Sequence, residues 1–165
     1  MNLLIVFLRK ILKSPNFMKA TLFLLYISFL LFSCKKGGEN KNQLIGTWQL
    51  ISGTLIEKGD TTITDYTTTI SFIKIINDTH FTFLQHDLNK GKDSSAVFGA
   101  GGGKYTLVGN LYKEELEYCN AREWEGNDFD FVVNIKNDTL IQEGVEKVEK
   151  AGVNRINIEK YIRMK

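Results

Sequence analysis

The sequence predicts an all-β protein, an eight-stranded antiparallel up-and-down barrel that follows an N-terminal leader. Three observations predict this fold. Past residue 43, apolar and polar residues alternate, and no stretch keeps the i, i+3, i+4, i+7 apolar spacing of a helix. Glycine, asparagine and aspartate separate the alternating runs, as tight hairpin turns require. Proline is absent after Pro15, which suits long strands with unbroken hydrogen-bond ladders.

Residues 1–33 are predicted to be the leader. Lys19 follows Met18, and an apolar run at 20–32 then leads to Ser33. A charged start, an apolar run and a small residue are typical of an export signal, and we expect Met18 to be the true start of the chain. A helix over this run would rise about 20 Å, whereas a bilayer core is about 30 Å thick, so a stable membrane-spanning helix is disfavoured.

Cys34 follows the leader directly. The segment 31–34, Leu-Phe-Ser-Cys, resembles the lipobox of bacterial lipoproteins, although Phe32 stands where a smaller residue is usual. The resemblance implies that Cys34 is lipidated and becomes the mature N-terminus. The chain would then be exported and anchored in the cell envelope, on the periplasmic face or at the outer membrane. A cleaved soluble export signal and an uncleaved anchor are the alternatives. Residues 34–43 form a polar, flexible tether in this interpretation.

The net charge changes when the leader is set aside. The whole chain has a formal charge of +2, but the leader holds four cations and no acidic residue. The remaining 132 residues contain 17 cations and 19 acidic residues, which gives them a net charge of −2. Nucleic-acid binding requires a basic excess, so the sequence predicts no nucleic-acid partner.

Alternating runs repeat throughout residues 44–165, the predicted barrel domain. Eight antiparallel strands joined by short hairpins, with no helix to cover a sheet face, bury their apolar side by closing into a barrel. The threonine-rich stretch at 61–69 is interpreted as exposed strand and turn. The eight predicted strands cover residues 45–56, 66–76, 80–85, 97–108, 111–119, 128–136, 139–143 and 154–164.

Two details of the connections carry structural predictions. The phrase Ile-x-Asn-Asp-Thr occurs at 75–79 and again at 135–139, and we interpret it as one turn type used twice, with residues that tolerate positive φ. Gly99 and the glycines at 101–103 interrupt one run, where a glycine marks a bend or a bulge. A phosphate-binding loop is not predicted there, because Tyr105 replaces the required serine or threonine and a strand follows.

The first and last strands carry a resemblance to the lipocalins. Gly46, two residues before Trp48, and Arg163 near the end of the chain resemble the lipocalin signature, in which a tryptophan closes one barrel end under an arginine. This arrangement also has a physical basis as a cation–π contact. With the strand count and the leader, the chain resembles the lipocalin-like domain of small secreted lipoproteins of Bacteroidota-type bacteria. That resemblance implies a calyx-like (calycin) barrel and no assigned activity. Further similar phrases are found at residues 102–107, 112–118 and 120–124.

Alternation in the run 111–119 predicts which side chains face the barrel interior. Tyr112, Glu114, Leu116 and Tyr118 share one face, which is the more aromatic face and is therefore expected to point inward. Glu114 would be part of a hydrogen-bonded network, a polar anchor for a ligand or a catalytic acid. Tyr105 of the neighbouring run is a further candidate for ligand contact.

The segment 120–127 is predicted to be a loop at the barrel mouth, where recognition groups are common. Arg122 and Trp124 in this loop suit an amphipathic or anionic ligand. Alternatively, Trp124 folds down as a lid over the core.

Other chemistry is not predicted. His80 and His86 are six residues apart, about 20 Å along a strand, so they cannot share one metal ion, and no cofactor is expected. We expect a monomeric, non-catalytic, membrane-anchored lipoprotein whose barrel binds a small apolar or amphipathic molecule. The alternative is an envelope protein with a side-chain-filled barrel that serves structure or protein interaction.

Overall fold

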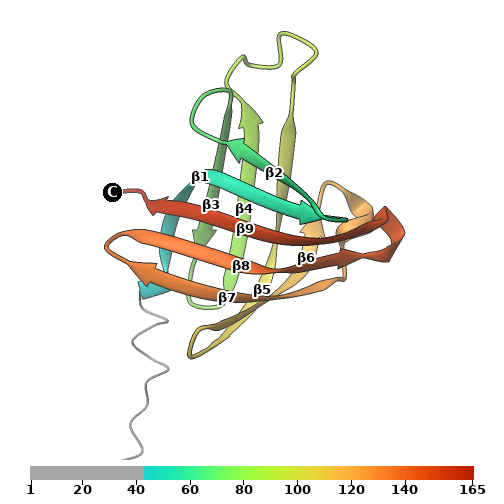
Figure 1. Cartoon of the computed structure of the whole chain (residues 1–165). Coiled ribbons are helices and arrows are strands. Elements are labelled where there is room, and N and C mark those ends of the chain that lie inside the picture. The colour runs from blue at the N-terminus through green and yellow to red at the C-terminus, as the bar shows by residue number, and fades with distance from the viewer. Residues whose placement is uncertain (1–42) are drawn as a thin grey trace, which may run out of the picture. The chain divides into compact units, whose positions relative to one another are not determined.

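The computed structural model describes residues 43–165 (Figure 1), so the leader and Cys34 lie outside the described residues. Nine antiparallel strands and two short 3-10 turns make up the fold, and the strands pair into one continuous sheet. The elements are β1 (Gly46–Glu57), β2 (Asp60–Asp65), β3 (Ile70–Ile76), β4 (His80–Asp87), β5 (Phe98–Val108), β6 (Leu111–Cys119), η1 (Arg122–Trp124), β7 (Asp128–Lys136), β8 (Thr139–Val148), η2 (Glu149–Ala151) and β9 (Val153–Arg163).

Eight of the nine strands close into a barrel. Consecutive strands pair from β3 to β9, and β1 completes the ring because it pairs with β3 along its first residues and with β9 along most of its length. The register of closure runs from Trp48 opposite Arg163 to Ile56 opposite Ile156. The predicted eight-stranded antiparallel barrel is confirmed.

Strand β2 was not predicted as a separate barrel element. It pairs only with the second half of β1, from Ser52 opposite Asp65 to Glu57 opposite Asp60. In Figure 1, β2 leaves β1 in a hairpin beside the closed ring. Because β3 already occupies this edge of the first half of β1, β2 extends the sheet without entering the ring.

The end of β8 differs from the prediction. The sequence pattern placed the strand at 139–143, but β8 continues to Val148 and pairs with β9 throughout. Gly144 allows this continuation, since a Cβ atom there would lie 2.3 Å from the backbone oxygen of Asp130 and 2.6 Å from the ring of Phe131. The glycine therefore marks a close approach of two strands and not the end of one.

The two Ile-x-Asn-Asp-Thr phrases form different turns, so the interpretation of one turn used twice is wrong. Asn137 and Asp138 both have positive φ, 48° and 58°, in a two-residue hairpin loop. Asn77 instead accepts hydrogen bonds at its side-chain oxygen from the backbone N–H groups of Thr79 (2.9 Å) and His80 (2.8 Å). The loop of three residues between β3 and β4 gives the asparagine side chain room to bond its own turn.

One end of the barrel, here called the packed end, is closed by Trp48. Its indole is fully buried, donates a hydrogen bond to the Leu44 carbonyl oxygen (2.8 Å), and lies 4.0 Å from the guanidinium carbon of Arg163. Arg163 also donates to the backbone oxygens of Ile45 (2.8 Å) and Gln43. The pairing of Trp48 with Arg163 is the one that the sequence predicted. At Gly46, φ is 146° and a Cβ atom would lie 2.5 Å from the Arg163 guanidinium, so this position requires glycine.

The packed end holds most of the apolar core, and the barrel is a self-contained folding unit. The ring closes within residues 46–163, and its interior is filled there by its own side chains. Among residues 43–165, no helix is long and apolar enough to cross a membrane. The buried core residues are Leu44, Trp48, Leu50, Ile76, Phe81, Tyr105, Tyr112, Leu116, Phe129, Phe131, Val133, Leu140, Val148 and Tyr161.

Candidate functional site

A cavity of about 370 Å³ occupies the other half of the barrel, here called the cavity end. The cavity is lined by side chains from seven of the eight strands in the ring. Side chains from β2, Tyr66 and η1 complete the lining. β1 contributes Gly53 and Leu55 to the lining, β5 contributes Gly99, and Asn120 stands at the rim. Ligand pockets commonly measure about 300–1,000 Å³, so this cavity has the size of a small-molecule site.

Two groups of aromatic rings form the walls of the cavity. On the β3–β4 side, Phe72 stacks on Phe83 with ring centroids 5.6 Å apart, and Tyr66 meets Phe72 edge-on at 6.0 Å. On the η1–β7 side, Trp124 packs against Phe129 at 5.9 Å. Because β3 and β4 are separated from β7 by two or more strands in either direction around the ring, these walls lie across the barrel from each other.

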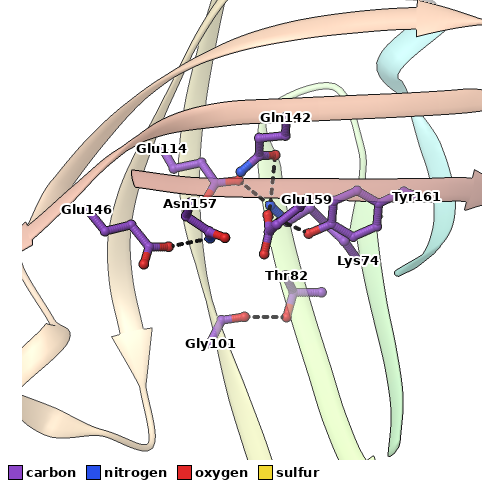
Figure 2. Close-up of polar contacts among 9 residues, drawn as sticks. All are labelled: Lys74, Thr82, Gly101, Glu114, Gln142, Glu146, Asn157, Glu159 and Tyr161. Atoms are coloured by element: carbon purple, nitrogen blue, oxygen red, sulfur yellow. Dashed lines mark hydrogen bonds and ion pairs between the residues drawn. The ribbon is translucent and has the colours of Figure 1, made fainter. Parts of the chain in front are cut away.

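A polar layer forms the floor between the cavity and the packed end (Figure 2), and Lys74 of β3 is at its centre. The Lys74 ammonium donates to Glu114 at 2.7 Å and to the side-chain oxygen of Gln142 at 3.0 Å, and it lies 4.0 Å from Glu159. Beneath it, the rings of Phe81, Tyr112 and Tyr161 are 5.5–6.0 Å away, within cation–π range. The ammonium is thus held between carboxylates and aromatic faces.

A second polar group lies on β8 and β9 at the cavity wall. One carboxylate oxygen of Glu146 accepts a hydrogen bond from Arg155 (2.7 Å), and the other accepts one from the side-chain amide of Asn157 (2.7 Å). The Arg155 guanidinium also faces the Trp124 ring, with 5.5 Å between its central carbon and the ring centroid. Each carboxylate oxygen of Glu146 is therefore hydrogen-bonded, and the Arg155 cation links β8 and β9 to the η1 loop.

Burial and charge shift the protonation equilibria of this layer. Burial acts to lower the pKa of Lys74, but the carboxylates of Glu114 and Glu159 outweigh it, so the pKa is raised and the ammonium is the stable form. Burial, followed by the charge of Glu159, raises the pKa of Tyr161 well above its ordinary value. Tyr66 has a pKa raised by the same two causes, so both phenols remain neutral donors at physiological pH.

The predicted residues of β5 and β6 divide between the floor and the packed end. Glu114 lines the cavity and is buried, as a member of the hydrogen-bonded network. Tyr112 is 1% exposed and packs against Tyr105 with ring centroids 5.3 Å apart, and neither ring lines the cavity. The Tyr105 hydroxyl donates to the Asn77 backbone oxygen (2.7 Å). Both tyrosines therefore support the floor from below and do not contact a ligand in the cavity.

The prediction that Tyr118 points into the barrel is wrong, because its side chain is on the outer face and is 69% exposed. The register of β5 with β6 steps from Gly103 opposite Leu116 to Gly102 opposite Tyr118, which leaves Glu117 as an extra residue. This bulge reverses the inward and outward alternation, so Cys119 faces the cavity instead. The glycine run had predicted a bulge or bend here, but not which side chains it would exchange.

The loop after β6 brings one of its two predicted residues to the cavity. Trp124, in η1, is half-buried and lines the cavity wall. Arg122 is not part of the lining, because its side chain is 81% exposed and pairs with Glu125 at 3.0 Å. Arg122 instead borders a shallow groove on the outer face beside Tyr118 and the glycines of β5.

The sequence analysis did not predict most of the polar residues in the floor and in the adjoining cavity wall. Lys74, Gln142, Glu146, Asn157 and Glu159 all face inward from β3, β8 and β9. The signal that could have revealed these residues was the alternation of inward and outward side chains along each strand. Lys74 alternates with the buried Ile76 and with Phe72, and the polar residues of β9 alternate with isoleucines that face outward. If the isoleucines were assigned to the interior by hydrophobicity alone, the inward and outward faces of β9 would be exchanged.

The sequence and the structure were compared with those of known proteins. No protein-family model matches the sequence, and no curated protein matches it significantly. The crystal structure of a mutant of the fluorescent protein UnaG is similar, with a TM-score of 0.34 and 12% sequence identity, over 74% of this chain and 96% of that chain. The barrel assignment is based on the strand pairing described above.

Proposed function

We propose that the chain is a membrane-anchored, lipocalin-like lipoprotein whose barrel binds one small amphipathic molecule without catalysing a reaction. The observation that carries this proposal is the cavity, with its two aromatic walls and its polar floor. Ligand pockets combine an apolar lining with a few fixed polar groups, and this combination suits a molecule with an apolar body and a polar end. A side-chain-filled barrel, the alternative expected from the sequence, has no such cavity.

The side chains of the cavity support binding over catalysis. Among the described residues that line it, there is no histidine, and burial raises the pKa of its one thiol, Cys119, which disfavours the nucleophilic thiolate. The buried carboxylates Glu114 and Glu146 are each bonded to a cation. Groups held in paired, rigid positions fix the orientation of a ligand.

A fluorescence titration with the neutral dye N-phenyl-1-naphthylamine tests the binding proposal on the fragment 43–165. We expect saturable enhancement of the dye emission with one site per chain. Leu55→Trp, which places an indole in the cavity, is expected to weaken binding at least about tenfold. Ile56→Trp is the matched control, because residue 56 is on the outer face of the same strand. If the dye does not bind, or binds Leu55→Trp and the parent equally, the cavity is not a binding site.

Membrane anchoring through Cys34 is the second part of the proposal, and the lipobox-like segment supports it. Expression of the full chain in a bacterium, followed by fractionation, tests it. We expect the parent in the membrane fraction with incorporated palmitate. Cys34→Ser is expected to lose the palmitate and to leave that fraction or to accumulate uncleaved. Equal labelling of both chains would contradict lipidation at this residue.

A further inference from the structure

The charges that line the cavity do not balance. Three carboxylates, Glu114, Glu146 and Glu159, face two cations, Lys74 and Arg155, so the lining carries one formal negative charge. An uncompensated charge in a cavity of low polarity is unfavourable, and a bound counter-charge relieves this cost. The imbalance therefore favours a ligand with a positive charge.

Glu159 is the least paired of the three carboxylates. Lys74 bonds Glu114 at 2.7 Å but lies 4.0 Å from Glu159, and Arg155 and Asn157 both bond Glu146. Among the described residues, Glu159 accepts one hydrogen bond, from the Tyr161 hydroxyl at 2.8 Å. A carboxylate has about four acceptor positions, so Glu159 keeps free positions for a ligand donor. Its side chain is 14% exposed and lines the cavity.

The walls of the cavity also favour a cation with a flat apolar body. Ring faces attract positive charge, and the guanidinium of Arg155 already lies over Trp124. Tyr66 and Phe72, on the opposite wall, are edge-on to each other and line the same space. If a planar ring system lay between these walls, the charged end of the ligand could contact the polar floor.

Gln142 provides an independent indication of a ligand. Its side chain is 1% exposed, it lines the cavity, and its amide nitrogen has no hydrogen-bond partner among the described residues. The amide orientation is fixed, because the Lys74 ammonium can only donate and so requires the Gln142 oxygen. A buried donor without a partner is costly, and an acceptor on the ligand would satisfy it.

We infer that the ligand is an aromatic or similarly flat amine, protonated at neutral pH, which bonds Glu159 through its ammonium group and offers an acceptor such as a hydroxyl to Gln142. This inference rests on the proposed binding function and narrows its ligand class. It differs from the sequence-based expectation of an amphipathic or anionic ligand at Arg122, which is exposed and outside the cavity.

Three matched probes test the inference by calorimetry on the fragment 43–165. All carry a naphthalene ring and a benzylic hydroxyl: 2-amino-1-(1-naphthyl)ethanol is a cation, 1-(1-naphthyl)ethanol is neutral, and 1-naphthylglycolate is an anion. The cation is expected to bind at least about tenfold more tightly than the neutral probe, the gain from one charge-assisted hydrogen bond, and the anion is expected to bind most weakly. This comparison needs no variant, so it does not depend on how a mutant folds.

Glu159→Gln locates the preference. We expect it to reduce the affinity of the cation about tenfold, to the level of the neutral probe, and to leave the neutral probe unchanged. Glu143→Gln, on the outer face of β8, is the charge-matched control and is expected to keep the preference. The inference is overturned if the neutral or anionic probe binds as tightly as the cation, or if the preference survives in Glu159→Gln. If only the neutral probe bound tightly, the proposed binding function would be supported and the preference for a cation would be wrong. If no probe bound, both proposals would be wrong.

Discussion

The two ends of the barrel are built by the same strands but hold different interiors. At the packed end, β8 and β9 contribute Leu140 and Tyr161, which are both fully buried members of the core. A few residues along, the same inward faces carry Glu146 and Arg155. The change occurs at the layer around Lys74, where the interior turns from a filled core into a cavity. β8 and β9 therefore divide their inward residues between the filled core at one end and the cavity at the other.

The largest expected effect is a difference in unfolding free energy between substitutions at the packed end and at the cavity end. Trp48→Ala removes a fully buried indole from the packed end, and we expect a loss of about 3–5 kcal/mol in the free energy of unfolding, because the cavity left behind cannot collapse. Trp124→Ala, at the half-buried cavity wall, is expected to cost about 1 kcal/mol. Urea unfolding of the fragment 43–165 measures both. Equal losses would show that the cavity end carries as much stability as the packed end.

The next effect concerns the boundary between the ends. Lys74→Met leaves Glu114 buried without its cation, and we expect a loss of about 3 kcal/mol in unfolding free energy. In the double variant Lys74→Met/Glu114→Leu, we expect part of the stability to return, since residue 114 no longer carries an unpaired buried charge. A double-mutant cycle by urea unfolding gives the coupling between the two residues. Additive losses would show that the ion pair does not hold the floor.

A smaller effect is expected at the closure of the packed end. Arg163→Met removes the cation from the Trp48 ring and a donor from the Ile45 carbonyl, and we expect a loss of about 1–2 kcal/mol. Arg163→Lys keeps the charge but lacks the planar group that reaches both partners, so it is expected to recover less than half of this loss. Thermal unfolding followed by tryptophan fluorescence measures both. Full recovery in Arg163→Lys would mean that the charge alone closes this end.

The smallest effect is a pH response confined to the cavity end. Asp87 accepts backbone hydrogen bonds from Gly91 (2.9 Å) and Val97 (3.2 Å), which hold the loop between β4 and β5. The Gly91 bond, the largest cause, lowers the pKa of Asp87 in the folded state. The contribution of Asp87 to stability is thus complete above its unfolded pKa and is lost as the pH falls through the folded pKa.

Amide chemical shifts in an acid titration test this response. The Gly91 and Val97 amides are expected to shift with a midpoint below pH 3.8, the ordinary aspartate value, while the Trp48 indole N–H stays unchanged. Asp87→Ala is expected to abolish the transition. A midpoint at or above 3.8 would show that these hydrogen bonds do not favour the charged carboxylate.

The barrel could be predicted because period-two alternation and turn residues are local signals. Trp48 and Arg163 were paired through the resemblance to the lipocalin signature, and they lie on β1 and β9, the two strands that close the barrel. Strand β2 could not be placed as a separate element, because five of its six residues are polar and show no alternation of apolar and polar side chains. The end of β8 was missed at Gly144 because the sequence does not show that Phe131 occupies the space of its side chain.

The candidate site was harder to predict than the fold. Tyr118 was assigned to the wrong face because the extra residue Glu117 exchanges the inward and outward faces of the residues that follow it. Such a bulge depends on the partner strand and cannot be located from one strand alone. The polar floor was missed because hydrophobicity assigns lysine and glutamate to the surface. Their burial becomes favourable only when partners from distant strands meet, as Lys74 and Glu114 do across the barrel floor.

The closure of β1 on β9 sets an order in which the fold can be completed. β1 can form its ladders with β2 and β3 early, using local contacts, but its other edge must wait for the final strand, more than a hundred residues later. Contacts of such long sequence separation are entropically costly and slow to form. During synthesis, which begins at the N-terminus, one edge of β1 therefore stays unpaired until β9 has been made. Until then, this edge can associate with other chains.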